Sequence, residues 1–262
     1  MDVEWLLSFK TLAVGAFLAL FLVYERVRPA VDHPLLVRFR RAPAAAWRRI
    51  ARNTGLFGIN LLISPLIVLP ITLWAEQFSL GLRPAWLSGW TGLAFDLVLL
   101  DFWIYWWHRA NHEIPLLWRF HQVHHFDELL DSTTAIRFHF GEVVLSALVR
   151  AVVIIVLDVP LSSVLVFEAL VLMSAIFHHS DARLPPRLEQ ALSRVIITPS
   201  IHWVHHHAIR RDTDSNYGTI FSFWDPIFRS RSPTRRWATM PIGVEGRRDR
   251  PLARLIVTPF WR

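Results

Sequence analysis

The chain has 262 residues, is 53% hydrophobic and has a mean hydropathy of +0.34. These values are too apolar for an ordinary soluble domain and indicate a polytopic membrane protein. Lys10 is the only lysine, so arginine dominates the net charge of +7, an excess that indicates orientation and contact with anionic lipid rather than nucleic acid. The absence of cysteine excludes disulfides, cysteine-ligated iron–sulfur clusters and thiolate-ligated haem.

Five apolar stretches predict helices at a membrane. In chain order they are Leu6–Tyr24, Gly55–Ala75, Trp90–Trp107, Gly141–Leu157 and Leu161–Phe177. We expect the first to be a retained anchor, because the acidic start and the missing cleavage site do not fit a signal peptide. The last two stretches are short for spans and are joined at Val159, so they form either a transmembrane or a re-entrant hairpin.

Two charges lie within that hairpin. Arg150 and Glu168 are each nine residues from Val159, so an antiparallel hairpin brings them to about the same depth. An unpaired charge at that depth is costly, and the sequence therefore predicts an ion pair between them.

The distribution of arginine predicts the orientation in the membrane. Residues 26–52 contain eight arginines, whereas the loop between the second and third stretches contains only Arg83. The positive-inside rule then places residues 26–52 in the cytoplasm and the N-terminus outside. Residues 108–140 then fall on the cytoplasmic side as well, and so does everything after Phe177 if the hairpin crosses the membrane twice. The arginine-rich and alanine-rich composition suggests a bacterial inner membrane.

Residues 38–52, RFRRAPAAAWRRIAR, have two possible interpretations. They form either an amphipathic surface helix held by anionic lipid or a solvated basic loop.

Histidine is the most informative residue type in the chain. Three clusters hold eight of the thirteen histidines at helical spacing, so that the imidazoles of a cluster share one helix face. The clusters are His108 with His112, His121 with His124 and His125, and His202 with His205 and His206. A single zinc ion takes three or four protein ligands, so this number predicts two metal ions. Imidazole suits iron, zinc and copper alike, and no His-Glu-x-x-His protease motif occurs. Two redox-active metals would suit the activation of O2 against a lipid C–H bond.

Several motifs resemble one family. The run DFWIYWWHRANHEIPLLWRFHQVHH at 101–125, together with TTAIRFHFGE, FHHSDARLP, TPSIHWVHHH, DSNYG and FWDPIF in that order, resembles the fatty acid hydroxylase/sterol desaturase superfamily of membrane di-iron oxygenases. The likeness covers roughly residues 95–230. It implies hydroxylation or desaturation of a lipid with two iron ions, with O2 as co-substrate. It also implies two electrons from a separate donor of the ferredoxin or cytochrome type.

The resemblance implies ten metal ligands, which are His108, His112, His121, His124, His125, His139, His179, His202, His205 and His206. The role of His178 stays open, because it could support the ligands from outside or exchange roles with His179. We expect His207 to be exposed and His33 to lie at the membrane interface.

Ligating histidines usually donate their second N–H to a carboxylate or a carbonyl. The candidates for such outer partners are Asp101, Glu142, Asp214, Asn216 and Asp225, with His178 beside them. Asp101 could instead bond to a neighbouring helix, and Asn216 could simply form a turn.

Together these features predict an all-α polytopic membrane protein with four or five transmembrane or re-entrant helices and a cytoplasmic, helical, histidine-rich cap. We expect N-terminal anchor helices at 1–90, a catalytic domain at 91–230 and an arginine- and proline-rich cytoplasmic tail at 231–262. The predicted function is that of a di-iron lipid hydroxylase or desaturase. The alternatives are a zinc-dependent membrane hydrolase and an inactive metal-binding membrane scaffold.

Overall fold

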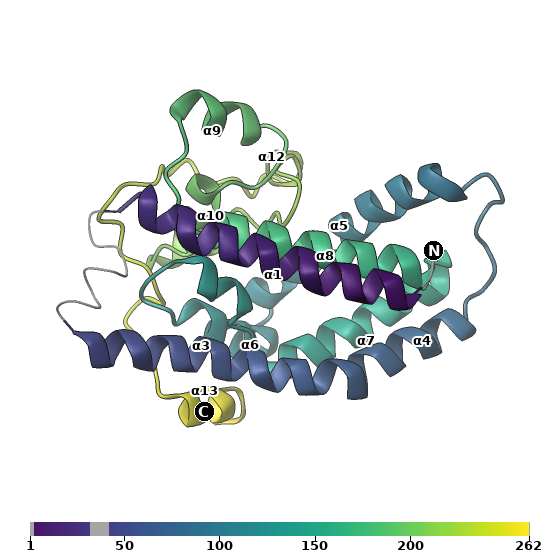
Figure 1. Ribbon diagram of the computed structural model, residues 1–262, viewed down its shortest axis with the longest axis horizontal. Helices are drawn as coiled ribbons and strands as arrows, with labels where there is room; N and C mark the ends of the chain where they lie inside the picture. The colour runs from purple at the N-terminus through teal and green to yellow at the C-terminus, as the bar shows by residue number, and fades with distance from the viewer. Residues whose placement is uncertain (1–2, 32–41, 262) are drawn as a thin grey trace.

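The computed structural model describes residues 3–31 and 42–261, and every regular element in these ranges is a helix (Figure 1). The long helices are α1 (Val3–Val27), α5 (Gly89–Glu113), α7 (Phe140–Leu157) and α8 (Leu161–His179), and a further long segment consists of α3 (Pro43–Ile63), η1 (Ser64–Val68) and α4 (Leu69–Gln77) in continuous succession. The shorter ones are α6 (Pro115–His125), η2 (Ser132–Ile136), α9 (Pro186–Leu192), α10 (Pro199–His205), α11 (Arg210–Thr213), α12 (Trp224–Ile227), α13 (Leu252–Val257) and η3 (Thr258–Phe260). The prediction of an all-α chain is confirmed.

Four helical segments of the described chain are long and apolar enough to cross a membrane, and they are Ser8–Val27, Pro43–Gln77, Phe140–Leu157 and Leu161–His179. At 1.5 Å per residue, the last two are about 27 and 29 Å long, close to the roughly 30 Å of a bilayer core. The predicted stretch at 90–107 forms most of α5 but is not among the four, because Asp96 and Asp101 interrupt its apolar sequence. The chain is an integral membrane protein with the predicted number of long helices.

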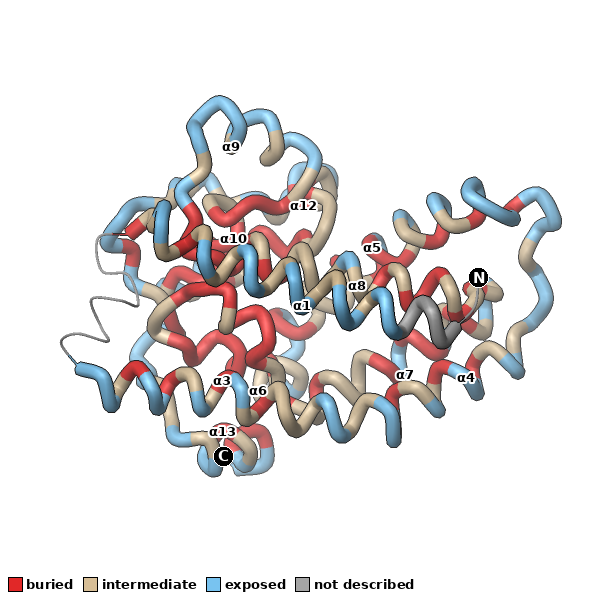
Figure 2. Tube along the Cα trace, in the orientation of Figure 1, coloured by how far each residue is buried: buried red, intermediate tan, exposed pale blue. Residues whose placement is uncertain are grey.

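Most of the long helices run roughly along the longest axis of the molecule, and α10 and α13 lie in the half away from the N-terminus (Figure 1). In this arrangement α1 packs beside α8, and α4 packs beside α7. Figure 2 shows that buried backbone gathers around α6 and α10, whereas the long helices keep exposed outer faces. Large apolar side chains such as Leu12, Leu66 and Trp90 are exposed on these helices, as expected of a lipid-facing surface.

The helical segment from Pro43 to Gln77 is continuous and contains one π-helical turn, η1. At η1 the backbone N–H of Leu69 donates to the carbonyl of Ser64, five residues back instead of four. Pro65 lies within this turn and Pro70 directly after it, and neither has an N–H to donate to the regular α-helical pattern, which explains the local widening.

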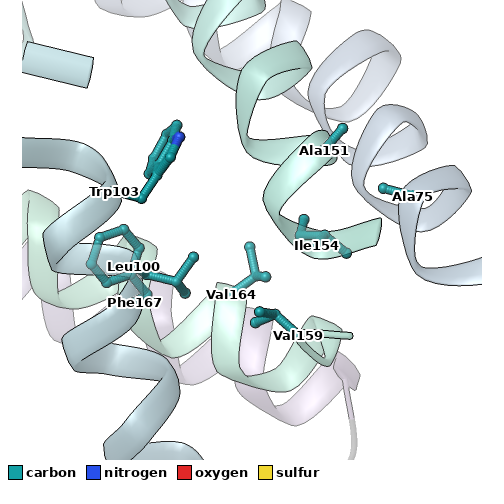
Figure 3. Packing of buried hydrophobic residues seen from close by; sticks show 8 residues of the cluster. All are labelled: Ala75, Leu100, Trp103, Ala151, Ile154, Val159, Val164 and Phe167. Carbon is teal, nitrogen blue, oxygen red and sulfur yellow. The ribbon is translucent and has the colours of Figure 1, made fainter. Parts of the chain in front are cut away.

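The apolar centre of the bundle joins four helices. Figure 3 shows Ala75 of α4, Trp103 of α5, Ala151 of α7 and Phe167 of α8 in one buried cluster. The two residues next to this cluster in sequence, Arg150 and Glu168, are the charges for which a pair was predicted.

The predicted ion pair within the hairpin is confirmed. Arg150 Nη2 lies 2.8 Å from Glu168 Oε1. Lys10 Nζ of α1 adds a second bond to Glu168 Oε2 at 2.5 Å, a partner that the spacing within the hairpin could not reveal. The turn itself is set by Asp158, whose φ of 54° is left-handed, and by Pro160 at the start of α8.

Over its described part, residues 42–52, the basic segment is a helix with exposed Trp47 and Arg48, so the loop alternative is wrong. Here α3 begins at Pro43 and continues directly into the long segment. Arg49 points inward and is buried, with Nε bonded to Asp127 Oδ1 and Nη1 to Asp131 Oδ2, both at 2.7 Å. Burial alone would raise the pKa of Asp127, but Arg49 and Arg137 beside it hold that pKa well below its ordinary value. Residues 38–41 and His33 lie outside the described residues.

Residues near the C-terminal end of the chain pack against this segment. Leu255 of α13 is buried in a cluster with Leu56 of α3 and Val123 of α6. Asp249 forms ion pairs with Arg52 and Arg137. The C-terminal region therefore helps to hold α3 against the helix that bears one of the histidine clusters.

Candidate metal centre

Nine of the ten predicted ligands come together in two groups. The first group holds five imidazoles from α5, α6 and α10, which are His108, His112, His121, His125 and His205. The second holds four, which are His124 of α6, His179 of α8, His202 of α10 and His206 just after α10. Within each group one ring nitrogen per residue lies within 4.8 Å of all the others. Either set could hold a metal ion.

The Nε2 atoms of the second group lie in close contact. His179 Nε2 is 3.0 Å from both His124 Nε2 and His202 Nε2, and His206 Nε2 is 3.1 Å from His202 Nε2. In the first group His125 Nε2 is 3.2 Å from His121 Nε2. Nitrogens bound about 2.1 Å from one metal ion would lie roughly 3.0–3.4 Å apart, so these spacings match the edges of a coordination shell.

The other ring nitrogen often bonds to a backbone carbonyl, which fixes the tautomer. His124 Nδ1 donates to the carbonyl of Arg137 at 3.1 Å, and His179 Nδ1 donates to that of Ala175 at 2.7 Å. A neutral imidazole that donates from Nδ1 has a lone pair at Nε2. The 3.0 Å contact between these two Nε2 atoms therefore brings two lone pairs together, an arrangement that a cation between them would stabilise.

The first group shows the same pattern. His108 Nδ1 donates to the carbonyl of Tyr217 at 2.8 Å, and His205 Nδ1 donates to that of Ser215 at 2.7 Å. His205 Nε2 and His112 Nε2 are buried and have no hydrogen-bond partner among the described residues. Buried nitrogens of this kind are normally bonded, so the donor set fits a metal ion.

The electrostatics of the site favour the neutral, metal-binding form of histidine. Burial lowers the pKa of His125 and His206 well below the ordinary value, and neighbouring imidazoles lower it further. Burial likewise lowers the pKa of His205 to about 3. These imidazoles are neutral at physiological pH and do not need to lose a proton to bind a metal.

His139 is the predicted ligand that the structure does not bring to either group. Its Nδ1 accepts from the backbone N–H of Gly141, and its Nε2 bonds to the carbonyl of Ile256, both at 2.9 Å. It is the N-cap residue of α7. Because both nitrogens already have backbone partners, we leave His139 out of the proposed ligand set.

We expect His139→Asn to leave the metal content unchanged, since asparagine caps helices well and can replace the bond to Gly141. The measurement is the number of metal ions per chain in purified protein, with His202→Asn as the matched control that should lower it. A fall in metal content for His139→Asn would restore His139 as a ligand.

Two further histidines lie beside the groups. The ring of His178 is 3.9 Å from that of His202, centroid to centroid, but His178 belongs to neither group. The prediction that His207 is exposed is wrong. It is buried against Trp237 and bonds through Nδ1 to Asp212 Oδ2 at 2.8 Å, because the chain folds back at α11 and covers it.

Two of the predicted outer partners contact ligand candidates. Glu142 Oε1 of α7 accepts from His121 Nδ1 at 2.8 Å. Asp214 Oδ1 lies 3.3 Å from His112 Nδ1, and Arg210 holds the other oxygen of the same carboxylate at 2.6 Å.

The remaining candidates hold the loop after α11 rather than a histidine. Asp101 accepts from the backbone N–H groups of Ile220 and Phe221 and from Trp224 Nε1. This agrees with the alternative in which Asp101 bonds to a neighbouring helix and not to a histidine. Asn216 has a φ of 53° and forms the turn.

Asp225 has an indirect role. Its carboxylate accepts from the backbone N–H groups of Tyr217 and Gly218 at 2.7 and 3.0 Å. It thereby holds in place the backbone carbonyl of Tyr217, which accepts the hydrogen bond from His108 Nδ1.

A cavity of about 330 Å³ begins at the histidines and extends between the long helices. Its polar end is lined by His108, His121, His124, His178, His179 and His202. Most of the remaining wall is apolar and includes Trp103, Ala147, Phe167 and Val171. A volume in this range and an apolar wall with few polar groups are typical of a site for a small hydrophobic ligand.

A family model described as fatty acid hydroxylase matches residues 93–230, more than half of the chain. The chain belongs to the fatty acid hydroxylase family. The match contains all nine grouped histidines, whereas the cavity wall that α1 and α3 contribute lies outside it.

Several curated proteins are similar to this family member. The ornithine lipid hydroxylase OlsE of Rhizobium tropici is 28% identical over 72% of this chain and 54% of its own length. The alkylglycerol monooxygenase of Homo sapiens is 32% identical over 60% of this chain and 34% of its own length. A cholesterol 25-hydroxylase-like protein of Danio rerio is 26% identical over 79% of this chain and 82% of its own length. The chain thus matches about half or less of the first two relatives, and no solved structure matches it significantly.

The sequence could not reveal every residue that orients the grouped histidines. The carbonyls of Arg137, Ala175, Ser215 and Tyr217 fix four imidazoles, yet a carbonyl carries no sequence signal. Arg137 itself is buried, and its guanidinium bonds to Asn53, Asp249 and the carbonyl of Val123. Its position within the motif TTAIRFHFGE was the one feature of the sequence that could have indicated a role for Arg137 near the site.

We expect Glu142→Ala to weaken metal binding about 10- to 100-fold, because it removes the acceptor that orients His121. Titration of the apoprotein with metal measures this affinity, and Glu142→Gln should give an intermediate value. Glu113→Ala is the control, since Glu113 is an exposed helix residue paired with Arg109. Equal affinity for Glu142→Ala and the control would contradict the assigned role.

Proposed function

We propose that the protein is a membrane-bound di-iron oxygenase that hydroxylates or desaturates a lipid C–H bond. The observation that carries this proposal is the convergence of nine buried histidines in two groups at one end of an apolar cavity. The similarity to lipid hydroxylases and monooxygenases supports the reaction class.

The two groups would hold one iron ion each. Five imidazoles would bind the first ion and four would bind the second, which leaves open positions on a six-coordinate metal. When bound, the iron ions supply the oxidising chemistry towards O2 and a C–H bond that no side chain of this chain can provide.

The protein's own residues perform three tasks. The carbonyls and carboxylates around the site hold each imidazole in one tautomer and one orientation. The apolar wall of the cavity excludes water and places the hydrocarbon beside the histidines. The packing of α5, α6, α8 and α10 keeps the two groups next to each other.

Orientation and partners follow from charge. Arg49 of the arginine-rich segment pairs with Asp127, two residues after the histidines of α6. Under the positive-inside rule this supports a site on the cytoplasmic side, and the membrane we propose is a bacterial inner membrane. Anionic headgroups would contact the arginines there. Two electrons per turnover would come from a separate ferredoxin or cytochrome on that side.

Metal analysis of anaerobically purified protein, combined with O2 uptake in the presence of membrane lipid and a reductant, tests the proposal. We expect about two iron ions per chain and O2 uptake that matches oxidised lipid. Active protein with two zinc ions and no need for O2 would identify a hydrolase instead. Iron without O2 uptake in the presence of any lipid fraction would favour the scaffold.

A further inference from the structure

A group of three charges lies on the wall of the cavity, well away from the histidines. It consists of Lys10 of α1, Arg150 of α7 and Glu168 of α8, and all three line the cavity. Glu168 bonds to both cations, at 2.5 Å to Lys10 and 2.8 Å to Arg150. We call this group the charged triad.

The charged triad carries one more positive than negative charge. The other carboxylate on the cavity wall, Glu142, bonds to His121 near the metal groups and cannot compensate it. A net charge at membrane depth is costly unless a counter-charge or strong hydrogen-bond acceptors are present. Within the described part of the chain, the triad thus has an unmet preference for an acceptor.

Two hydrogen-bond donors on the same cavity wall also have no partner among the described residues. They are Arg150 Nε and Trp103 Nε1, both buried, in residues that are 7% and 9% exposed. Trp103 packs in the same cluster as Ala151 and Phe167, the sequence neighbours of Arg150 and Glu168 (Figure 3). Buried donors are almost always bonded, so both point to an oxygen that a ligand supplies.

The separation between the charged triad and the metal groups follows from helix geometry. Arg150 is eight residues beyond Glu142 on α7, which is about 12 Å at 1.5 Å per residue. Glu168 is eleven residues before His179 on α8, which is about 16 Å. The triad and the histidines therefore lie at opposite ends of the cavity.

We propose that the charged triad and Trp103 bind a hydrogen-bond-accepting oxygen of the lipid substrate, with the hydrocarbon extending towards the histidines. The substrate is then an amphiphile whose polar oxygen is bound about two to three helical turns along α7 and α8 from the histidines. A carboxylate and a neutral hydroxyl share this chemistry. The oxidation of the hydrocarbon beside the histidines rests on the proposed function, whereas the binding of the oxygen does not.

Binding of three C16 probes to the full-length protein in detergent micelles tests this inference, with native mass spectrometry as the readout. The probes are palmitate, 1-hexadecanol and hexadecane, at a pH where palmitate is ionised. We expect palmitate to bind most tightly and hexadecane least tightly. Because lipid binding is measured without turnover, a failure of the oxygenase proposal would leave this test intact.

Charge variants separate recognition from a structural role. Arg150→Gln should weaken palmitate about 10-fold or more, weaken hexadecanol less, and leave hexadecane unchanged. Glu168→Gln should have the opposite effect on the affinity for palmitate. Palmitate should bind more tightly because the cavity wall becomes more positive. Tighter binding of hexadecanol as well would assign recognition to hydrogen bonding rather than to charge.

The matched control is Arg83→Gln. Arg83 pairs with Asp96 at 2.8 Å and does not line the cavity, so the affinity for all three probes should stay unchanged. If Arg150→Gln weakens all three probes equally, or if both triad variants weaken palmitate, the triad is only structural and the inference fails.

Discussion

His124→Ala should remove the metal of the second group and reduce lipid oxidation to background. His124 Nε2 lies 3.0 Å from His179 Nε2, and its ring contacts that of His206, so it belongs to the centre of that group. Loss of an outer partner already weakens metal binding about 10- to 100-fold, so loss of a direct ligand should cost at least about 100-fold. Iron per chain should fall from two towards one.

The matched control for this prediction is His207→Ala. His207 follows the same histidine cluster and is equally buried, but it bonds to Asp212 and belongs to neither group. Metal content and oxidised lipid should stay near wild type in the control. Two iron ions and full activity in His124→Ala would contradict the assignment of the second group.

Arg49→Met should be among the most destabilising single changes in the chain. It leaves Asp127 and Asp131 buried without their cation, and breaking a buried ion pair in this way costs roughly 3–5 kcal/mol. For a chain of this size the thermal midpoint should fall by about 10 °C. Thermal unfolding in detergent micelles, followed by circular dichroism, measures the change.

Two comparisons make the Arg49 prediction specific. Arg48→Met, at the exposed neighbouring position, should change the thermal midpoint little. Adding Asp127→Asn and Asp131→Asn to Arg49→Met should recover part of the loss, because no unpaired charge then remains. A midpoint for Arg49→Met equal to that of Arg48→Met would show that the buried ion pairs do not stabilise the fold.

Local spacing predicted those features that depend on neighbours along the chain. Histidines three or four residues apart share a helix face, which is why the clusters at 108–125 and 202–206 could be recognised. The nine-residue symmetry about Val159 predicted the pair of Arg150 with Glu168 for a similar reason. Pairing within one hairpin depends only on distance from its turn.

Features that depend on distant segments could not be predicted from spacing. His139 resembles the other ligands in sequence, but the carbonyl of Ile256 near the end of the chain takes one of its nitrogens. Asp101 looked like a partner for a histidine, but its carboxylate accepts hydrogen bonds from the backbone N–H groups of Ile220 and Phe221 instead. Arg49 appeared to be a surface charge, because its partners Asp127 and Asp131 are about eighty residues away.

Location of iron by anomalous diffraction at the iron edge tests the central claim most directly. The account predicts two peaks per chain, one enclosed by His108, His112, His121, His125 and His205 and the other by His124, His179, His202 and His206. A single peak, or a peak bound by His139, would contradict it.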